Sequence, residues 1–214
     1  MAVPELKANK TDSNVQALIL SGGKTKCHRL PYSSAVHRYD MIKKCWTKLQ
    51  SLKFGRKNHS MCYLASFLYV FGGYGKTEQA SMTIERLYYD NSNLFRQHWQ
   101  PLTISEGLIP SGDVRLCPMN KSEFLVLGGM AGDRSLNSNI LVLNIDSKIA
   151  RKLSANMREC CHSDVQFFYE DSQMHHINNN QVLFTLQGPS NKLWMLAYCH
   201  ENEKLECLET HTNV

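Results

Sequence analysis

Cationic and aromatic residues are concentrated in a few short segments that lie next to glycines or between apolar runs. An arginine side chain can hold a carboxylate with two parallel hydrogen bonds, and lysine adds a mobile positive charge. Tyrosine and phenylalanine rings supply apolar area to a contact surface. We therefore predict a surface that binds an acidic segment of a protein partner. Its candidate residues are Lys24, Arg29, Tyr32, Phe54, Arg56, Lys57, Asn58, Tyr74 and Arg134.

Metal-binding and nucleophilic chemistry have weaker signals. Cys160-Cys161-His162, followed by His175-His176, offers nitrogen and sulfur ligands for zinc. Adjacent cysteines on a strand point to opposite faces, which favours a strand start and a polar insertion over a zinc site. No sequence motif of a serine hydrolase, a zinc protease, a P-loop or a dinucleotide site is present. We expect no metal, no cofactor and no catalytic residue.

Length and composition limit the class of protein. The chain of 214 residues and 24.5 kDa suffices for one large domain or two small ones. A net charge of +5 falls short of the dense basic stripe of a nucleic-acid binder. No apolar run reaches the ~18–20 residues of a membrane helix, and the N-terminus lacks the apolar stretch of a secretory signal. We expect a cytoplasmic protein, outside the membrane, with its eight cysteines as free thiols.

The elements that position these residues repeat along the chain. Apolar runs end at Gly22-Gly23, Gly72-Gly73 and Gly128-Gly129, with a degenerate fourth at Gly188. The first glycines lie 50, 56 and 60 residues apart, close to the ~40–50-residue period of propeller blades. Sixteen residues beyond each complete pair, an apolar strand-like run ends in Tyr39-Asp40, Tyr89-Asp90 or Ile145-Asp146. Tryptophan follows twice, as Trp46 and Trp99.

These features resemble the kelch repeat, in which a strand ends in Gly-Gly and a tyrosine and a tryptophan follow. The resemblance covers about residues 17–208, and its first two repeats match best. It implies an all-β fold, a kelch-type β-propeller of about four blades or a partial, incompletely closed propeller. We expect a flexible segment over residues 1–16 and a propeller domain over 17–214. The expected blades are residues 17–50, 58–102, 113–153 and 162–208.

The second repeat shows the expected blade most clearly. We predict its strands at residues 60–64, 67–71, 83–89 and 98–102, with Ala65-Ser66 as a hairpin turn. The glycines permit backbone angles closed to other residues, and the aromatic rings fill the wedge between blades. The first repeat begins at its second strand. The resemblance implies that its first strand comes from the C-terminus, where residues 210–214 are available.

The resemblance implies a non-catalytic protein-binding module, an adaptor or scaffold that meets its partner through rim loops. Alternatives are the substrate-recognition part of a ubiquitin ligase, with a BTB or F-box function supplied elsewhere, and an actin-binding scaffold. A copper radical oxidase is a further alternative from the wider superfamily. Its site needs a cross-linked Cys–Tyr pair and two histidines, for which the nearest residues are Cys27, Tyr32, His28 and His37. Neither the partner nor the oligomeric state follows from the sequence.

Overall fold

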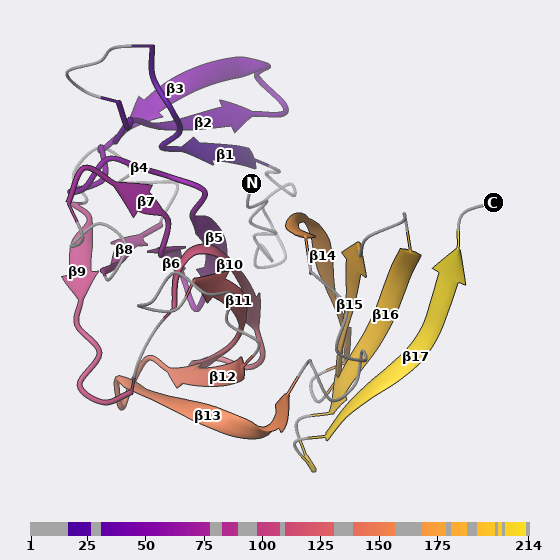
Figure 1. The fold of residues 1–214 in the computed structure, drawn as a ribbon. Coiled ribbons are helices and arrows are strands. Elements are labelled where there is room, and N and C mark those ends of the chain that lie inside the picture. The colour runs from indigo at the N-terminus through magenta and orange to yellow at the C-terminus, as the bar shows by residue number, and fades with distance from the viewer. Residues whose placement is uncertain are drawn as a thin grey trace, which may run out of the picture. The chain divides into compact units, whose positions relative to one another are not determined.

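The computed structural model contains only strands and turns as regular structure in the residues that it describes (Figure 1). These residues are 17–26, 31–77, 83–89, 98–107, 110–130, 139–156, 168–178, 181–187, 192–199, 201–202 and 204–212. The expected flexible segment 1–16 lies outside them. The chain divides into two compact units, Met1–Thr103 (the N-terminal unit) and Ile104–Val214 (the C-terminal unit).

The N-terminal unit holds two antiparallel sheets and a small ribbon. In the first sheet the order is β1-β2-β3, and in the second it is β5-β6-β8-β9, while β4 pairs with β7. The strands are β1 (Ala17–Ser21), β2 (Val36–Asp40), β3 (Cys45–Leu49), β4 (Arg56–Lys57), β5 (Ser60–Leu64), β6 (Phe67–Phe71), β7 (Tyr74–Gly75), β8 (Ile84–Tyr88) and β9 (Gln100–Leu102).

The C-terminal unit holds two four-stranded antiparallel sheets, each with its strands in chain order. Every sheet therefore grows from consecutive hairpins, as the repeat pattern predicts. The strands are β10 (Ser111–Pro118), β11 (Glu123–Met130), β12 (Asn139–Asn144), β13 (Ile149–Asn156), β14 (Phe168–Asn178), β15 (Gln181–Gln187), β16 (Lys192–Cys199) and β17 (Lys204–Thr212).

The all-β class and the antiparallel arrangement agree with the prediction. The bounds of β5 and β6 match the predicted 60–64 and 67–71, and β8 and β9 fall inside the predicted third and fourth strands. Ala65 and Ser66 form the turn between β5 and β6 with φ of +47° and +67°. Positive φ at both central residues gives a turn whose twist fits the twist of the two strands.

The glycine pairs adopt backbone angles that a side chain disfavours. Both glycines of the pairs at residues 22–23, 72–73 and 128–129 have φ between +65° and +107°. At Gly22 there is also no room for a side chain, because a Cβ would collide with the Arg56 carbonyl oxygen and lie 2.6 Å from His59 Cε1. The pairs therefore allow the chain to leave one strand and pass close to the next repeat.

The core of the N-terminal unit lies between its two sheets. Ile19, Val36 and Leu49 of the first sheet form one buried cluster with residues of the second sheet, including Tyr89 and Trp99. The Trp99 indole Nε1 also donates a 2.8 Å hydrogen bond to the Gln50 carbonyl oxygen. The prediction that the repeat aromatics fill the space between neighbouring sheets is confirmed for this pair of sheets.

The strand that the resemblance implies from the C-terminus is not seen in the described part of the chain. The first sheet has three described strands and does begin at the second strand of its repeat. Thr210, His211 and Thr212 pair with Trp194, Leu193 and Lys192, and they form the end of β17. The described C-terminal residues therefore extend a strand that starts at Lys204.

Candidate partner-binding rim

Three loops of the N-terminal unit are joined by backbone hydrogen bonds at the end of the sheets where the glycine pairs lie. The Gly23 amide donates to the Arg56 carbonyl oxygen (2.8 Å), and the Ser33 amide donates to the Gly23 carbonyl oxygen (2.8 Å). The Arg56 amide donates in turn to the Ser33 carbonyl oxygen (3.0 Å). The β4–β7 ribbon adds the loop after the second glycine pair. These bonds fix the positions of the loops that carry the predicted contact residues.

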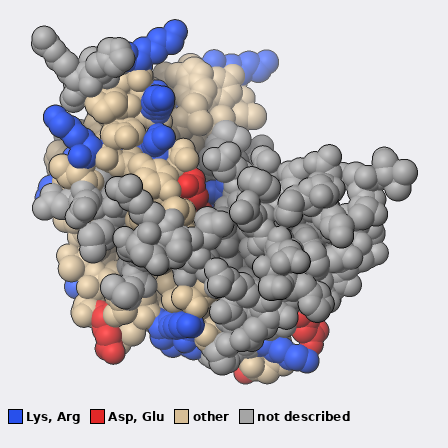
Figure 2. Space-filling view, in the orientation of Figure 1, with Lys and Arg blue, Asp and Glu red and all other residues tan. Residues whose placement is uncertain are grey.

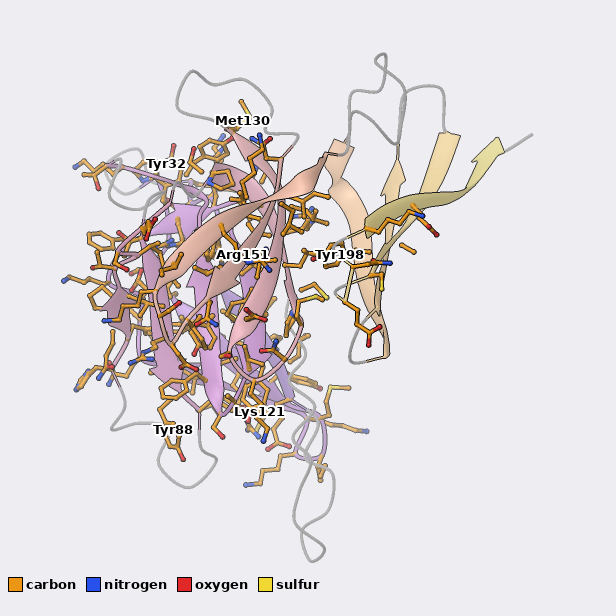
Figure 3. All side chains as sticks on the ribbon, turned by 90° about the horizontal axis from the view of Figure 1, so that it is seen from below. Tyr32, Tyr88, Lys121, Met130, Arg151 and Tyr198 are labelled. Atoms are coloured by element: carbon orange, nitrogen blue, oxygen red, sulfur yellow. The ribbon has the colours of Figure 1, made fainter. Side chains whose placement is uncertain are left out.

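Five of the predicted residues come together on these loops, which we call the rim: Lys24, Tyr32, Phe54, Lys57 and Tyr74. Lys24 and Tyr32 are paired by a β-bridge, and Lys57 faces Tyr74 in the ribbon. The Lys57 ammonium lies 5.8 Å from the centre of the Tyr74 ring. All five are at least partly exposed. Figure 3 shows Tyr32 at one end of the sheets and Tyr88 at the other.

The sixth predicted residue, Asn58, is exposed and follows β4 directly. Its φ of +51° places it in the left-handed region, which asparagine tolerates better than most residues. Asn58 therefore serves the turn from β4 to β5, next to the rim. Three further lysines, Lys26, Lys53 and Lys76, are exposed on the same loops.

Carboxylates are absent from the described surface of this unit. Its described acidic residues are Asp40 and Glu85, which are 6% and 0% exposed. Asp40 pairs with Arg38 at 3.0 Å and Glu85 pairs with Arg56 at 2.7 Å. The lysines around the rim therefore have no described carboxylate to pair with at the surface of this unit, and blue side chains predominate over the upper left of Figure 2. A surface of this kind attracts acidic groups.

The net charge of the whole chain is the sum of two halves with opposite charge. Residues 1–103 contain fifteen lysines and arginines against six aspartates and glutamates, a net charge of +9. Residues 104–214 contain nine against thirteen, a net charge of −4. The net charge of +5 is the sum of a basic half and an acidic half, which composition alone does not reveal.

Among the predicted contact residues that the structure describes, Arg56 differs most from its predicted role. It is fully buried, and its Nη1 donates to the carbonyl oxygens of Gly72 (2.8 Å) and Thr83 (3.0 Å). Its Nη2 donates to Glu85 Oε1 at 2.7 Å. Burial lowers the pKa of Arg56, and the charge of Glu85 acts in the opposite direction. Arg56 holds the rim loops onto the second sheet from inside, so we do not retain it as a contact residue.

The remaining predicted sites lie outside the described residues or show no cluster. Arg29 and Arg134 are outside the described ranges, as are Cys27, His28 and the Cys160-Cys161-His162 run. Within the described part of the chain, no three His, Cys, Asp or Glu side chains gather as metal ligands do. A search of the same ranges finds no helix long and apolar enough to span a membrane.

Sequence reasoning missed a contact between Ser21 and His59. Ser21 Oγ lies 2.6 Å from His59 Nε2, at the end of β1. The neighbouring Gly22 and Gly23 amides already donate to Ala35 and Arg56 carbonyl oxygens, and no described group bonds His59 Nδ1. The described residues thus offer this pair neither oxyanion donors nor an orienting carboxylate, both of which a hydrolytic triad uses. The contact joins the two repeats.

The reduced cysteines agree with the prediction where the structure describes them. Cys45, Cys62, Cys117 and Cys199 are not in disulfide bonds. Burial raises the pKa of the Cys117 thiol to about 12, which keeps it protonated and unreactive at neutral pH.

No family model matches the sequence, and no curated protein matches it.

Proposed function

We propose that the chain is a kelch-type β-propeller, or part of one, that binds a protein partner through the rim without catalysis. The partner would present an acidic segment with apolar side chains. Lysines of the rim attract its carboxylates, and the rings of Tyr32, Phe54 and Tyr74 provide apolar contact area. The observation that carries the proposal is the joining of three loops into one surface with cations, aromatic rings and no described carboxylate.

The repeat architecture supports the propeller part of this proposal. Four sheets follow one another along the chain, each over one predicted blade, and Tyr89 and Trp99 pack between the first two. A rigid set of sheets that presents loops at one end is a common arrangement for binding. An adaptor, the recognition part of a ubiquitin ligase and an actin-binding scaffold all use such a surface, so the proposal is limited to partner binding.

Reversing three rim lysines is expected to weaken the binding of acidic peptides. In Lys24→Glu/Lys57→Glu/Lys76→Glu, we expect the Kd for a fluorescein-labelled peptide pool rich in Glu, Asp, Leu and Tyr to rise at least tenfold. Attraction between exposed charges weakens with salt, so binding to the wild-type chain should also weaken from 50 to 300 mM NaCl. Fluorescence anisotropy measures both effects.

The matched control is Lys43→Glu/Lys44→Glu/Lys48→Glu, which changes the net charge equally. Lys43 and Lys44 lie in the turn at the far end of β2, and Lys48 lies on β3. This variant should bind the peptide pool within about threefold of wild type, because surface charges act mainly within a Debye length of roughly 10 Å. An equal loss in both variants would attribute the binding to overall charge and contradict a rim site.

A further inference from the structure

One face of the first sheet has no cover from the other described residues of the N-terminal unit, although its residue types belong to a core. Leu18, Tyr39 and Trp46 stand opposite one another on β1, β2 and β3, and Leu20 lies on the same face. Trp46 is 51% exposed and Leu20 is 42% exposed. The Tyr39 and Trp46 rings contact each other with their centres 5.0 Å apart. We call these four residues the back face.

The second sheet shows what such a face normally contacts. By their distance from the glycine pairs, Leu18, Leu20 and Tyr39 correspond to Leu68, Val70 and Tyr89, and Trp46 corresponds to Trp99 in the repeat. These counterparts are only 0%, 0%, 2% and 7% exposed, because they pack on the first sheet. The same residue types are thus buried in one repeat and partly or largely exposed in the other.

The contacts of Tyr89 and Trp99 show what kind of surface covers such a face in the second repeat. Trp99 bonds the Gln50 carbonyl oxygen, and the Tyr89 hydroxyl accepts a 2.9 Å hydrogen bond from Arg38 Nε. The remaining area is an apolar sheet face formed by Ile19, Val36 and Leu49. The occupant of the open back face should therefore be another sheet with an apolar face and polar groups at its border.

The charges around the back face indicate which kind of sheet would bind it. The exposed Lys43, Lys44 and Lys48 surround the back face, and the described acidic residue of this sheet, Asp40, is buried on the other face. A partner with acidic character would complement this surface. The C-terminal half of this chain, with its net charge of −4, combines that character with repeats of the same design.

We propose that the back face docks on the C-terminal unit of a second copy of this chain. Two copies joined in this way, each by its basic half to the acidic half of the other, form a closed twofold dimer with two identical contacts. Four sheets per chain lie at the lower limit of propeller rings, which typically have ~4–8 blades, whereas two chains together supply eight sheets.

Light scattering after size exclusion tests the dimer. The wild-type chain at 50 mM NaCl should have about twice the monomer mass of 24.5 kDa, and the dimer should dissociate more readily at 500 mM NaCl. Trp46→Ser should raise the dimer Kd about thirty-fold, as expected for a central aromatic contact. Because Trp46 is exposed in the single chain, this variant should keep the wild-type circular dichroism spectrum.

Two charge variants locate the contact. Lys43→Glu/Lys44→Glu/Lys48→Glu should raise the dimer Kd at least tenfold, while the rim variant Lys24→Glu/Lys57→Glu/Lys76→Glu should keep it within threefold. A chain that stays monomeric at every protein and salt concentration would overturn the proposal. This holds also if Trp46 proves to be covered by another part of its own chain. A dimer that none of these substitutions weakens would also overturn it.

A mixing experiment distinguishes the proposed pairing from contact between two back faces. Two facing back faces would bring lysines of both copies together, so the charge-reversed variant would pair with wild type more tightly than wild type pairs with itself. In the proposed pairing, each mixed dimer keeps one wild-type contact and loses the other. Mixed dimers should then be weaker than wild-type dimers, and stronger ones would rule out the proposed pairing.

Discussion

The variant Glu85→Gln is expected to lower the free energy of unfolding of the N-terminal unit by about 3–5 kcal/mol, the usual cost of leaving one buried charge without its partner. Glu85 and Arg56 are both 0% exposed and lie 2.7 Å apart. The glutamine amide would remove the negative charge but leave the guanidinium inside. The NH₂ group of the glutamine would also be a hydrogen-bond donor at a site where Arg56, Lys53 and Phe54 already donate.

The carboxylate of Glu85 has more than one function, which explains the size of the expected effect. It accepts hydrogen bonds from the backbone amides of Lys53 (2.5 Å) and Phe54 (3.2 Å) in addition to Arg56. These bonds tie the loop that follows the first sheet to β8 of the second sheet. Loss of the carboxylate would leave two partly buried backbone donors with weaker partners, and each such group adds to the cost.

A double-mutant cycle separates the ion pair from these backbone contacts. Arg56→Met, Glu85→Gln and the double variant should show a coupling of about 2 kcal/mol or more, because each single variant leaves one buried charge and the double variant leaves none. The double variant should still be less stable than wild type, since Met cannot bond the Gly72 and Thr83 carbonyl oxygens. Additive single effects would mean that the two charges do not stabilise each other.

Urea unfolding in a Trp194→Phe background measures these values, because both remaining tryptophans, Trp46 and Trp99, lie in the N-terminal unit. A reporter confined to one unit is needed, since a chain of two compact units does not have to unfold in one step. Lys57→Met is the matched control. It removes a positive charge one residue from Arg56 but at a partly exposed position, and should change the free energy of unfolding by less than about 1 kcal/mol.

Arg56 also shows what sequence reasoning captured and what it did not. Arg56 was predicted as a contact residue from its residue type, but a single sequence does not state whether a cation faces solvent or the interior. The signal that could have found the ion pair lies in β8 and the residue after it, where Glu85 is two residues from Leu87 and four from Tyr89, both of which are buried. Residues at a spacing of two lie on one face of a strand, and a charge on a buried face requires a buried partner.

The strands and turns were predictable because the information that specifies them is local. Glycine pairs with positive φ, hairpin turns and alternating strands depend on residues close together in the chain, and they fixed β5 and β6 to the residue. The difference between Tyr39 and Tyr89 was not predictable in this way. Both tyrosines occupy the same place in their repeats. Tyr89 is buried because the first sheet packs against it, whereas Tyr39 has no such described sheet and is partly exposed.

Acid is expected to weaken the N-terminal unit through the titration of His59. Burial, helped by the charge of Arg56, lowers the pKa of His59 from 6.5 to about 4. Above pH 6.5 the imidazole is neutral in both the folded and the unfolded chain, so its full contribution is present there. Between pH 6.5 and 4 the unfolded chain takes up a proton and the folded chain does not. Stability therefore falls over this range, by about 3 kcal/mol in total.

The location of His59 explains why protonation is unfavourable. Its ring lies between the two glycine pairs, 2.6 Å from the point where a Gly22 Cβ would stand, and its Cβ lies 2.8 Å from the corresponding point of Gly73. Nε2 is 2.6 Å from Ser21 Oγ, and the neutral ring can accept the proton of that hydroxyl. A protonated ring could no longer accept it and would place a second positive charge beside buried Arg56.

Unfolding by urea at pH 7.0, 6.0, 5.0 and 4.5, in the Trp194→Phe background, measures the slope. His59→Gln should be less stable than wild type at pH 7 and should lose little further stability down to pH 4.5, because the titrating group is gone. His98→Gln replaces an exposed histidine and should keep the wild-type slope. If His59→Gln and wild type lose stability in parallel between pH 6.5 and 4.5, His59 is not the group that makes the two repeats sensitive to acid.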